Sequence, residues 1–428
     1  MRSPRFLCCW PDGSAHSPML QRARGLRRLI LSVALAGIIT GVTYSVGARS
    51  PVPRDGGVIA PSASAGTAPI TVPQGRGGPT ENPGASPISG VPATRTTAPV
   101  NAPIATVMPS VIRNPSAAPQ PVAAPLPKGV SLAGADFAED MLPGTLGRDY
   151  TYPTLAELDY YHGKGINIIR LPFRWERVQT AQYASLDATN IEQIDGLVQG
   201  AGRRGMTIII DMHNYDRYYG GLIGQDVPDA ALADVWGRLA TRYAGASSIF
   251  YGIMNEPHDT NGHWPVTAQA AVDAIRRADM RHTILVSGDC WAGASSWQRC
   301  NDGLTVNDSV NNVVYEAHVY FDTDGSGRYP VGYDQSGAYP TIGVDRVQPF
   351  LGWLRAHNAR GFLGEYGVPG NDPRWLTVLD NFLGALDTAG VGGTYWAGGP
   401  WWGDYPLSVE PAKGQDRAQM GLLVRHAA

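Results

Sequence analysis

The second part of this chain repeats one pattern, in which short apolar runs alternate with helical stretches. Each run has the length of one buried strand, and the helical candidates lie between most of them. The runs cover residues 130–137, 166–173, 206–213, 249–257, 283–289, 313–320, 361–368 and 393–397. The helical candidates are residues 154–162, 191–204, 230–243, 266–277, 344–358 and 374–389. Strands joined through helices run parallel, with right-handed crossovers.

Eight such units between residue 128 and the C-terminus predict an α/β fold, a closed (β/α)₈ TIM barrel. The alternative is an open, doubly wound sheet. That fold would favour a glycine-rich phosphate-binding loop after an early strand, and the sequence has none. We therefore expect residues 128–428 to form one barrel domain.

Residues 29–46 are the only stretch apolar enough to meet a membrane. Four arginines at positions 22, 24, 27 and 28 precede it, and the small-residue sequence Val-Gly-Ala ends it at residue 48. This layout predicts that residues 1–48 are a secretory signal peptide, and the paired arginines also permit twin-arginine export. An uncleaved membrane anchor is the alternative, because the run is at the lower length limit for crossing a bilayer.

The cysteines fit an exported protein. The segment before residue 29 is long for a signal peptide, so we expect the chain to start at Met19 rather than Met1, which removes two of the four cysteines. The remaining Cys290 and Cys300 are expected to form a local disulfide in an oxidising compartment, with two free thiols as the alternative. No cysteine or histidine spacing is typical of a metal site.

Residues 49–127 have the composition of a linker. They contain 17 of the 34 prolines and no Phe, Tyr, Trp or Cys. Such a segment cannot bury enough apolar surface to offset the loss of chain entropy on folding. We expect a disordered Pro/Ala/Ser/Thr-rich linker, which would tether the barrel to the envelope if the export segment is not cleaved.

Charge and aromatic content narrow the function. The net charge of −3 gives no basic field for nucleic acid. Ten of the 11 Trp lie after residue 170, in the folded part. Core packing is the simple explanation for them, but tryptophans in loops also provide flat surfaces on which sugar rings stack.

Two of the apolar runs end in a glutamate, Glu256 in the fourth run and Glu365 in the seventh. In a (β/α)₈ barrel the chemistry takes place at the C-terminal ends of the strands. Cleavage of a glycosidic bond needs at least two carboxyl groups, and two glutamates on one rim would provide them. Other polar or aromatic residues at these ends are Arg170, His213, Asn255, His318, Tyr320 and Trp396. Any one of them alone could belong to a rim ion pair, whereas together they favour one site.

At these positions the chain resembles glycoside hydrolase family 5. The matching motifs are IRLPF at 169–173, DMHNY at 211–215, MNEPHD at 254–259, HVY at 318–320, GEYG at 364–367, and Trp396. The resemblance covers roughly residues 128–428. Residues 254–259 and 318–327 are most similar to the secreted endoglucanases that cut β-1,4-glucan.

The resemblance implies a role for each matched residue. Glu256 would be the general acid and then the general base, and Glu365 the nucleophile. Arg170 and Tyr320 would hold the Glu365 carboxylate, and Asn255 would bind the sugar 2-hydroxyl.

Further residues would shape the sugar subsites. His213 and His318 would do so by hydrogen bonds, and Trp396 would form the floor of the cleavage subsite. Candidates for outer subsites are Trp175, Trp291, Trp297, Trp401 and Trp402. Trp236, Trp353 and Trp375 lie in predicted helices and are expected to pack in the core. Residues 322–341 are expected to form a long loop on the rim.

The sequence thus predicts a secreted, monomeric, retaining endo-β-1,4-glucanase that needs no cofactor or metal and whose partner is a β-1,4-glucan. Its two carboxyl groups should lie about 5–5.5 Å apart. One alternative is activity on another β-glycan, such as mannan, mixed-linkage glucan or xyloglucan, because a fold does not fix the substrate. Another is a non-catalytic glycan-binding protein displayed at the envelope.

Overall fold

The computed structural model describes residues 125–427. The predicted export segment and nearly all of the predicted linker lie outside the described residues. Among the described helices, none is both long and apolar enough to cross a membrane.

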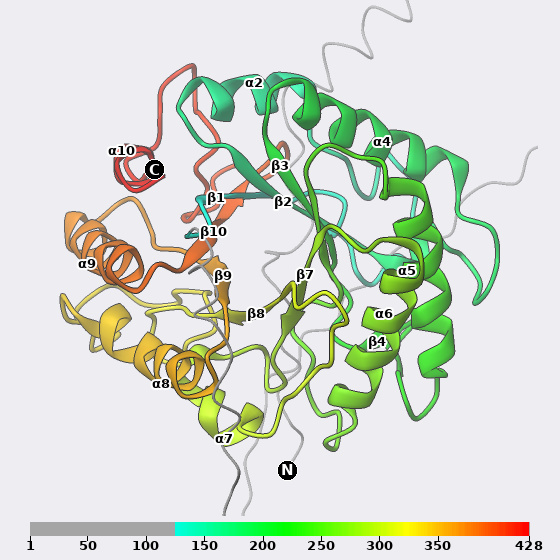
Figure 1. Cartoon of the computed structure of the whole chain (residues 1–428). Coiled ribbons are helices and arrows are strands. Elements are labelled where there is room, and N and C mark those ends of the chain that lie inside the picture. The colour runs from blue at the N-terminus through cyan, green and yellow to red at the C-terminus, as the bar shows by residue number, and fades with distance from the viewer. Residues whose placement is uncertain (1–124, 428) are drawn as a thin grey trace, which may run out of the picture. The chain divides into compact units, whose positions relative to one another are not determined.

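Eight parallel strands close into a barrel in the order β1-β10-β9-β8-β7-β6-β3-β2 (Figure 1). This confirms the predicted (β/α)₈ fold. The strands are β1 (Lys128–Leu132), β2 (Ile168–Phe173), β3 (Thr207–Met212), β6 (Ile249–Gly252), β7 (Thr283–Ser287), β8 (Val313–His318), β9 (Gly361–Tyr366) and β10 (Gly392–Gly398). Two short strands, β4 (Arg217–Tyr218) and β5 (Gly221–Leu222), form a separate antiparallel pair after β3.

Helices surround the barrel (Figure 1). The long ones are α2 (Leu155–Gly163), α4 (Ala188–Arg203), α5 (Asp229–Tyr243), α6 (Trp264–Ala278), α8 (Ile342–His357) and α9 (Pro373–Ala389). The short ones are α3 (Trp175–Val178), the 3₁₀ turn η1 (Ala294–Ser296), α7 (Trp297–Asn301) and α10 (Met420–Arg425). Most of the apolar core lies between strands and helices, and it contains Trp236, Trp353 and Trp375, which are at most 2% exposed. The prediction that these three tryptophans pack in the core is confirmed.

Side chains of alternate residues point into the barrel, because a strand has a period of two. Five of them form a separate apolar cluster in the barrel: Ile168, Ile209, Leu285, Val314 and Phe362. The residues two positions further along the same strands are Arg170, Asp211, Ser287, Glu316 and Gly364. The barrel interior therefore changes from apolar to polar toward the C-terminal ends of the strands, and the polar layer supports the site described below.

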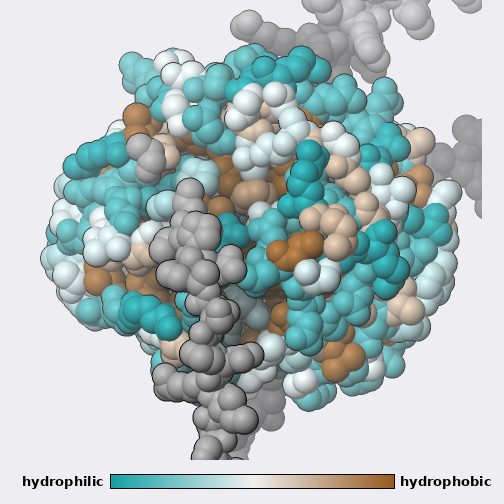
Figure 2. Space-filling view, viewed as in Figure 1, coloured by the Kyte–Doolittle hydropathy of each residue, from teal (hydrophilic) through white to brown (hydrophobic). Residues whose placement is uncertain are grey.

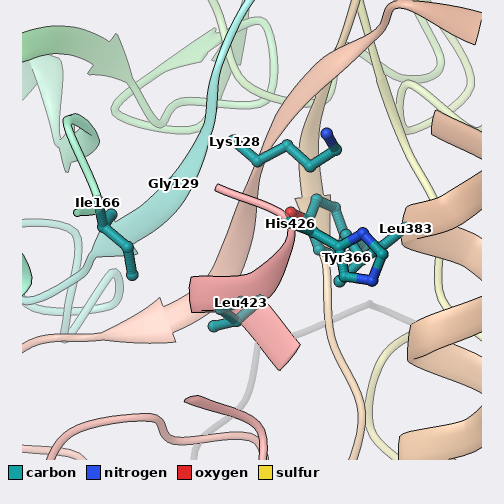
Figure 3. A pocket seen from close by; sticks show the side chains of 7 residues that line it. All are labelled: Lys128, Gly129, Ile166, Tyr366, Leu383, Leu423 and His426. Carbon is teal, nitrogen blue, oxygen red and sulfur yellow. The ribbon is translucent and has the colours of Figure 1, made fainter. Parts of the chain in front are cut away.

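The view of the molecule in Figure 2 shows a mostly hydrophilic surface with separate hydrophobic patches. A small pocket elsewhere lies between β1, β9, α9 and α10 (Figure 3). It is lined by Lys128, Gly129, Ile166, Tyr366, Leu383, Leu423 and His426. Lys128 and His426 both bind Asp387 there, so the polar groups of this pocket tie α10 to α9 and β1.

Candidate active site

Glu256 and Glu365 lie together at the C-terminal end of the barrel. Glu365 is in β9, and Glu256 follows β6. One oxygen from each carboxylate and one ring nitrogen of His318 all lie within 4.8 Å of one another. The side chains are nearly buried, with the Glu256 residue 8% and the Glu365 residue 2% exposed. The two carboxylates predicted to share a site are therefore neighbours.

Local backbone irregularities aim both glutamates at this point. Glu256 has a φ of +47°, a left-handed conformation that is rare for a residue with a long side chain. Asn255 anchors the turn, since its N–H donates to Met212 O at 2.7 Å and its carbonyl accepts from Tyr215 N at 2.9 Å. In β9 the pairing with β8 shifts register at Glu365, as a β-bulge does when it redirects a side chain.

Two donors hold the Glu365 carboxylate. Arg170 Nη1 donates to Oε1 at 3.0 Å, and the Tyr320 hydroxyl donates to Oε2 at 2.8 Å. Arg170 is fully buried. Burial alone would lower its pKa, but Asp211, Glu316, Glu365 and Glu256 raise it above the ordinary value, so the guanidinium keeps its charge. Glu365 thus accepts a hydrogen bond on each carboxylate oxygen, one from a buried guanidinium and one from a hydroxyl.

Asn255 is oriented by a chain of hydrogen bonds. Its Oδ1 accepts from Arg170 Nη2 at 2.6 Å, and its Nδ2 lies 3.3 Å from His213 Nε2. The other nitrogen of His213 lies 3.0 Å from Asp211 Oδ2. Burial lowers the pKa of His213 to about 3, so the ring is neutral. Its Nδ1–H then donates to Asp211 and its Nε2 accepts from Asn255, which fixes the direction of the amide.

His318 bridges the two glutamates. Its Nδ1 lies 2.6 Å from Glu256 Oε1 and 3.7 Å from Glu365 Oε2. Burial alone would lower the pKa of His318, but contacts with Glu365, Glu256 and Glu316 raise it to about 10. His318 is therefore an imidazolium at neutral pH and donates to Glu256.

Glu256, His318 and Glu365 are also the only trio within residues 125–427 whose ligand atoms lie close enough to hold one metal ion. A protonated His318 has no lone pair with which to coordinate a metal. The arrangement fits proton transfer and nucleophilic attack better than metal binding.

Comparison with known proteins agrees with this geometry. Residues 130–401 match the family model described as cellulase, glycosyl hydrolase family 5. The chain belongs to glycosyl hydrolase family 5. It is 34% identical over 292 residues to endo-beta-1,4-glucanase A of Emericella nidulans, an alignment that covers 67% of this chain and 87% of the relative.

Solved structures of family 5 endoglucanases superpose on the barrel. The Pseudomonas stutzeri endoglucanase Cel5A, solved in complex with cellobiose, has 43% sequence identity and a TM-score of 0.69. The match covers 71% of this chain and 95% of that one. XacCel5A, solved in complex with cellopentaose, has 38% identity and a TM-score of 0.67 over 71% of this chain and 99% of that one.

Four of the predicted subsite tryptophans lie on or after strands β7 and β10 of this family 5 barrel. Trp396 in β10 stacks on His213, with ring centres 5.4 Å apart, and meets the edge of Trp402 at 5.9 Å. Trp401 is 42% exposed, so its ring is accessible. Trp291 is half-buried and stacks on His258, with ring centres 3.5 Å apart. Three of these tryptophans lie on or after β10 and one lies in the loop after β7, and their role as sugar subsites stays a prediction.

Two of the predicted outer subsites are wrong. Trp175 is fully buried in α3, where its Nε1 donates to Gln179 Oε1 at 3.0 Å. Trp297 is fully buried in α7 and packs edge-on against Phe350 at 4.5 Å. Neither ring presents a face to a ligand, because both short helices turn these side chains into the core.

The loops around the site are also defined. Cys290 and Cys300 form the predicted disulfide. Residues 322–341 connect β8 to α8 without a helix or strand, as predicted for a long loop. Gly327 has a φ of +75°, and a Cβ atom there would lie 2.8 Å from the Tyr320 ring. The loop therefore packs directly against the tyrosine that binds Glu365.

The sequence analysis missed Glu316 and gave no role to Asp211. Both are fully buried and contact Arg170, with Asp211 Oδ2 3.1 Å from Nη2 and Glu316 Oε1 3.4 Å from Nε. Burial raises the pKa of Asp211 to about 7, although Arg170 opposes this. A charged residue inside an apolar run, two positions before a predicted site residue, is the signal that could have found them.

Proposed function

We propose that this family 5 protein is a secreted endo-β-1,4-glucanase that retains the configuration of the anomeric carbon. The observation that carries the proposal is the proximity of Glu256 and Glu365, within 4.8 Å at their nearest ligand atoms, with different hydrogen-bond partners. Retaining glycosidases hold their carboxyl groups about 5–5.5 Å apart, whereas inverting enzymes need more room for a water molecule. The choice of β-1,4-glucan is supported by the names of the relatives.

In the first step, Glu365 attacks the anomeric carbon and the bond to the leaving glucose oxygen breaks. Glu256 donates its proton to that oxygen, so the shortened chain leaves as an alcohol. The glycosyl group is then held as an ester of Glu365. In the second step Glu256 takes a proton from water, the water oxygen attacks the same carbon, and the Glu365 carboxylate leaves.

The neighbours of the glutamates support these roles. Arg170 and the Tyr320 hydroxyl stabilise the Glu365 carboxylate before attack and after departure. His318 keeps the Glu256 side chain in place through its Nδ1–H. Asn255, held by Arg170 and His213, would bind the 2-hydroxyl of the sugar at the cleavage point, a contact that strengthens in the transition state.

Aromatic rings would bind the sugars on either side of the cleaved bond. Trp396, stacked on His213 and close to the glutamates, would form the floor of the cleavage subsite. Trp401 and Trp402 would extend the site on the β10 side, and Trp291 on the β7 side.

Hydrolysis of a panel of β-glycans tests the substrate assignment. We expect a rapid fall in the viscosity of carboxymethylcellulose for few reducing ends released, the pattern of internal cleavage. A protein that releases sugar from mannan or xyloglucan but not from carboxymethylcellulose would contradict the β-1,4-glucan assignment.

A second experiment separates catalysis from binding. Glu365→Gln should abolish turnover and still bind cello-oligosaccharides, because the amide keeps the shape of the carboxylate but is a poor nucleophile. Wild-type protein that binds cello-oligosaccharides without cleaving them would instead support a glycan-binding protein.

Export is part of the proposal and depends on residues 1–48, outside the described residues. N-terminal sequencing of the protein from the culture medium should find a new terminus close to residue 49. Recovery of the intact chain in the membrane fraction would favour an uncleaved anchor.

A further inference from the structure

We propose that Glu316 is a positioning residue for this hydrolysis, which binds Arg170 and His318 from inside the barrel and keeps both ring nitrogens of His318 protonated. The inference rests on the proposed function for its kinetic consequences, although its structural part does not. Glu316 is in β8, two residues before His318, and none of its surface is exposed. It does not reach the site of bond cleavage, so it would act only through its neighbours.

Glu316 lies between the two cations of the site. Its Oε1 is 3.4 Å from Arg170 Nε and 3.6 Å from His318 Nε2. Among residues 125–427, none of these three atoms has a partner whose distance and angle make a hydrogen bond. They therefore face one another as the remaining donors and acceptor of a buried cluster. Such isolated polar atoms would be costly to bury unless they compensate each other's charge.

The surrounding strands are shaped to admit this carboxylate. Ser287 in β7, the register partner of Glu316, donates its hydroxyl to Oε2 at 3.1 Å. On the other side, a Cβ atom at Gly364 would lie 1.8 Å from Glu316 Oε1 and 2.7 Å from His318 Nε2. Any larger residue at position 364, directly before Glu365, would displace Glu316. The requirement for glycine there thus follows from the space that the carboxylate occupies.

The charges around His318 show what Glu316 adds. Glu256 and Glu365 face its Nδ1, and Glu316 faces its Nε2. Arg170 and Asp211, which pair with each other, lie next to these carboxylates and the imidazole. Burial alone would raise the pKa of Glu316, but Arg170 and His318 hold it below its ordinary value. Glu316 is therefore an anion and is the carboxylate that faces Nε2. With a proton on Nε2 as well as on Nδ1, the ring has one fixed orientation and always donates to Glu256.

One buried carboxylate would in this way control both catalytic glutamates. Arg170 binds Glu365 through Nη1 while Glu316 lies at its Nε. His318 binds Glu256 through Nδ1 while Glu316 lies at its Nε2. Loss of the negative charge would loosen both contacts without removing any group that touches the sugar.

The test is Glu316→Gln, which removes the charge and keeps the volume, measured on cello-oligosaccharides across pH. We expect kcat to fall by about 10- to 100-fold with KM changed by less than about two-fold. The alkaline limb of the pH profile should move by about one unit to lower pH, because removing an anion lowers the pKa of His318. Glu316→Asp, which keeps the charge, should recover part of this shift.

Asp308→Asn is the matched control. The side chain of Asp308 is 3% exposed and pairs with an arginine, Arg276, at 2.7 Å, but it lies outside the site. It should lower the melting temperature and leave the pH profile unchanged. Equal pH profiles for Glu316→Gln and wild type, or an equal shift in Asp308→Asn, would overturn the proposal.

A nitrogen-15 NMR titration of His318 gives a readout that depends on neither activity nor the proposed substrate. In the wild type, both ring nitrogens should remain protonated at neutral pH and lose a proton only well above it. A neutral His318 at pH 7 would overturn the proposal even if Glu316→Gln failed to fold. Absence of any hydrolysis by the wild type, with a protonated His318, would refute the proposed function and leave the structural role of Glu316 standing.

Discussion

The hydroxyl of Tyr320 provides a sharp test of how Glu365 is held. The hydroxyl donates to Glu365 Oε2 at 2.8 Å. Because Glu365 is only 2% exposed, a water molecule would not readily take the place of this hydroxyl. A hydrogen bond to a charged group contributes about 1.5–3 kcal/mol. At about 1.4 kcal/mol per factor of ten, Tyr320→Phe should lower kcat/KM by roughly 10- to 150-fold. Arg170 still binds the other oxygen, so a residual activity should remain.

The assay is the release of a nitrophenol from an aryl cellobioside, whose good leaving group needs little help from Glu256. This isolates the attack by Glu365. The matched control is Tyr251→Phe, since the Tyr251 hydroxyl donates to a buried carboxylate, Asp279, at 2.7 Å outside the site. The control should lose stability and keep its activity. A Tyr320→Phe rate within about two-fold of wild type would refute the view that this contact stabilises the nucleophile.

Four further substitutions have distinct expected outcomes. Glu256→Gln should cut the hydrolysis of cello-oligosaccharides by at least about a hundredfold but affect substrates with good leaving groups much less, as a comparison of the two rates will show. Burial raises the pKa of Asp216 to about 8, so the stabilising effect of its proton is complete below about pH 4 and is lost as the pH rises through 8. The melting temperature of Asp216→Asn relative to that of the wild type should therefore rise between pH 4 and pH 8. A difference in melting temperature that stays constant with pH would contradict this prediction. Trp401→Ala should raise KM for long cello-oligosaccharides more than for short ones, whereas Trp297→Ala should instead lower the melting temperature by several degrees, because Trp297 is core.

The fold was predictable from the sequence because the strands of a closed barrel are buried on both faces. Their apolar runs are therefore continuous and visible without a partner sequence. The predicted run 313–320, for example, contains β8 (Val313–His318). The predicted run is longer than the strand because Val319 and Tyr320 continue the apolar pattern beyond His318, the last residue of β8. Strand ends depend on hydrogen bonding with neighbours, which a local pattern does not contain.

The meeting of Glu256 with Glu365 followed from topology alone, since the C-terminal ends of parallel strands share one rim. The burial of individual tryptophans did not. Trp175 and Trp297 occur in short segments after strands, as rim residues do, but each begins a short helix that turns its ring inward. That direction is set by contacts with distant residues, such as Phe350 against Trp297.

Glu316 remained hidden for a related reason. Its partners Arg170, Ser287 and His318 come from three strands, and only the closed barrel brings them to one carboxylate. In sequence it is one acidic residue within an apolar run. Its spacing of two residues from His318 indicates that both side chains lie on the same face of the strand, but not which residues of other strands they contact.

Trapping the covalent intermediate tests the central claim most directly. A 2-deoxy-2-fluoro cellobioside with a good leaving group should form a stable ester on the enzyme. The fluorine slows both steps of the reaction, and the good leaving group speeds only the first, so the ester accumulates. Peptide mapping by mass spectrometry should locate the sugar on Glu365. A sugar attached to Glu256 or to any other residue would contradict the assignment of the two carboxylates.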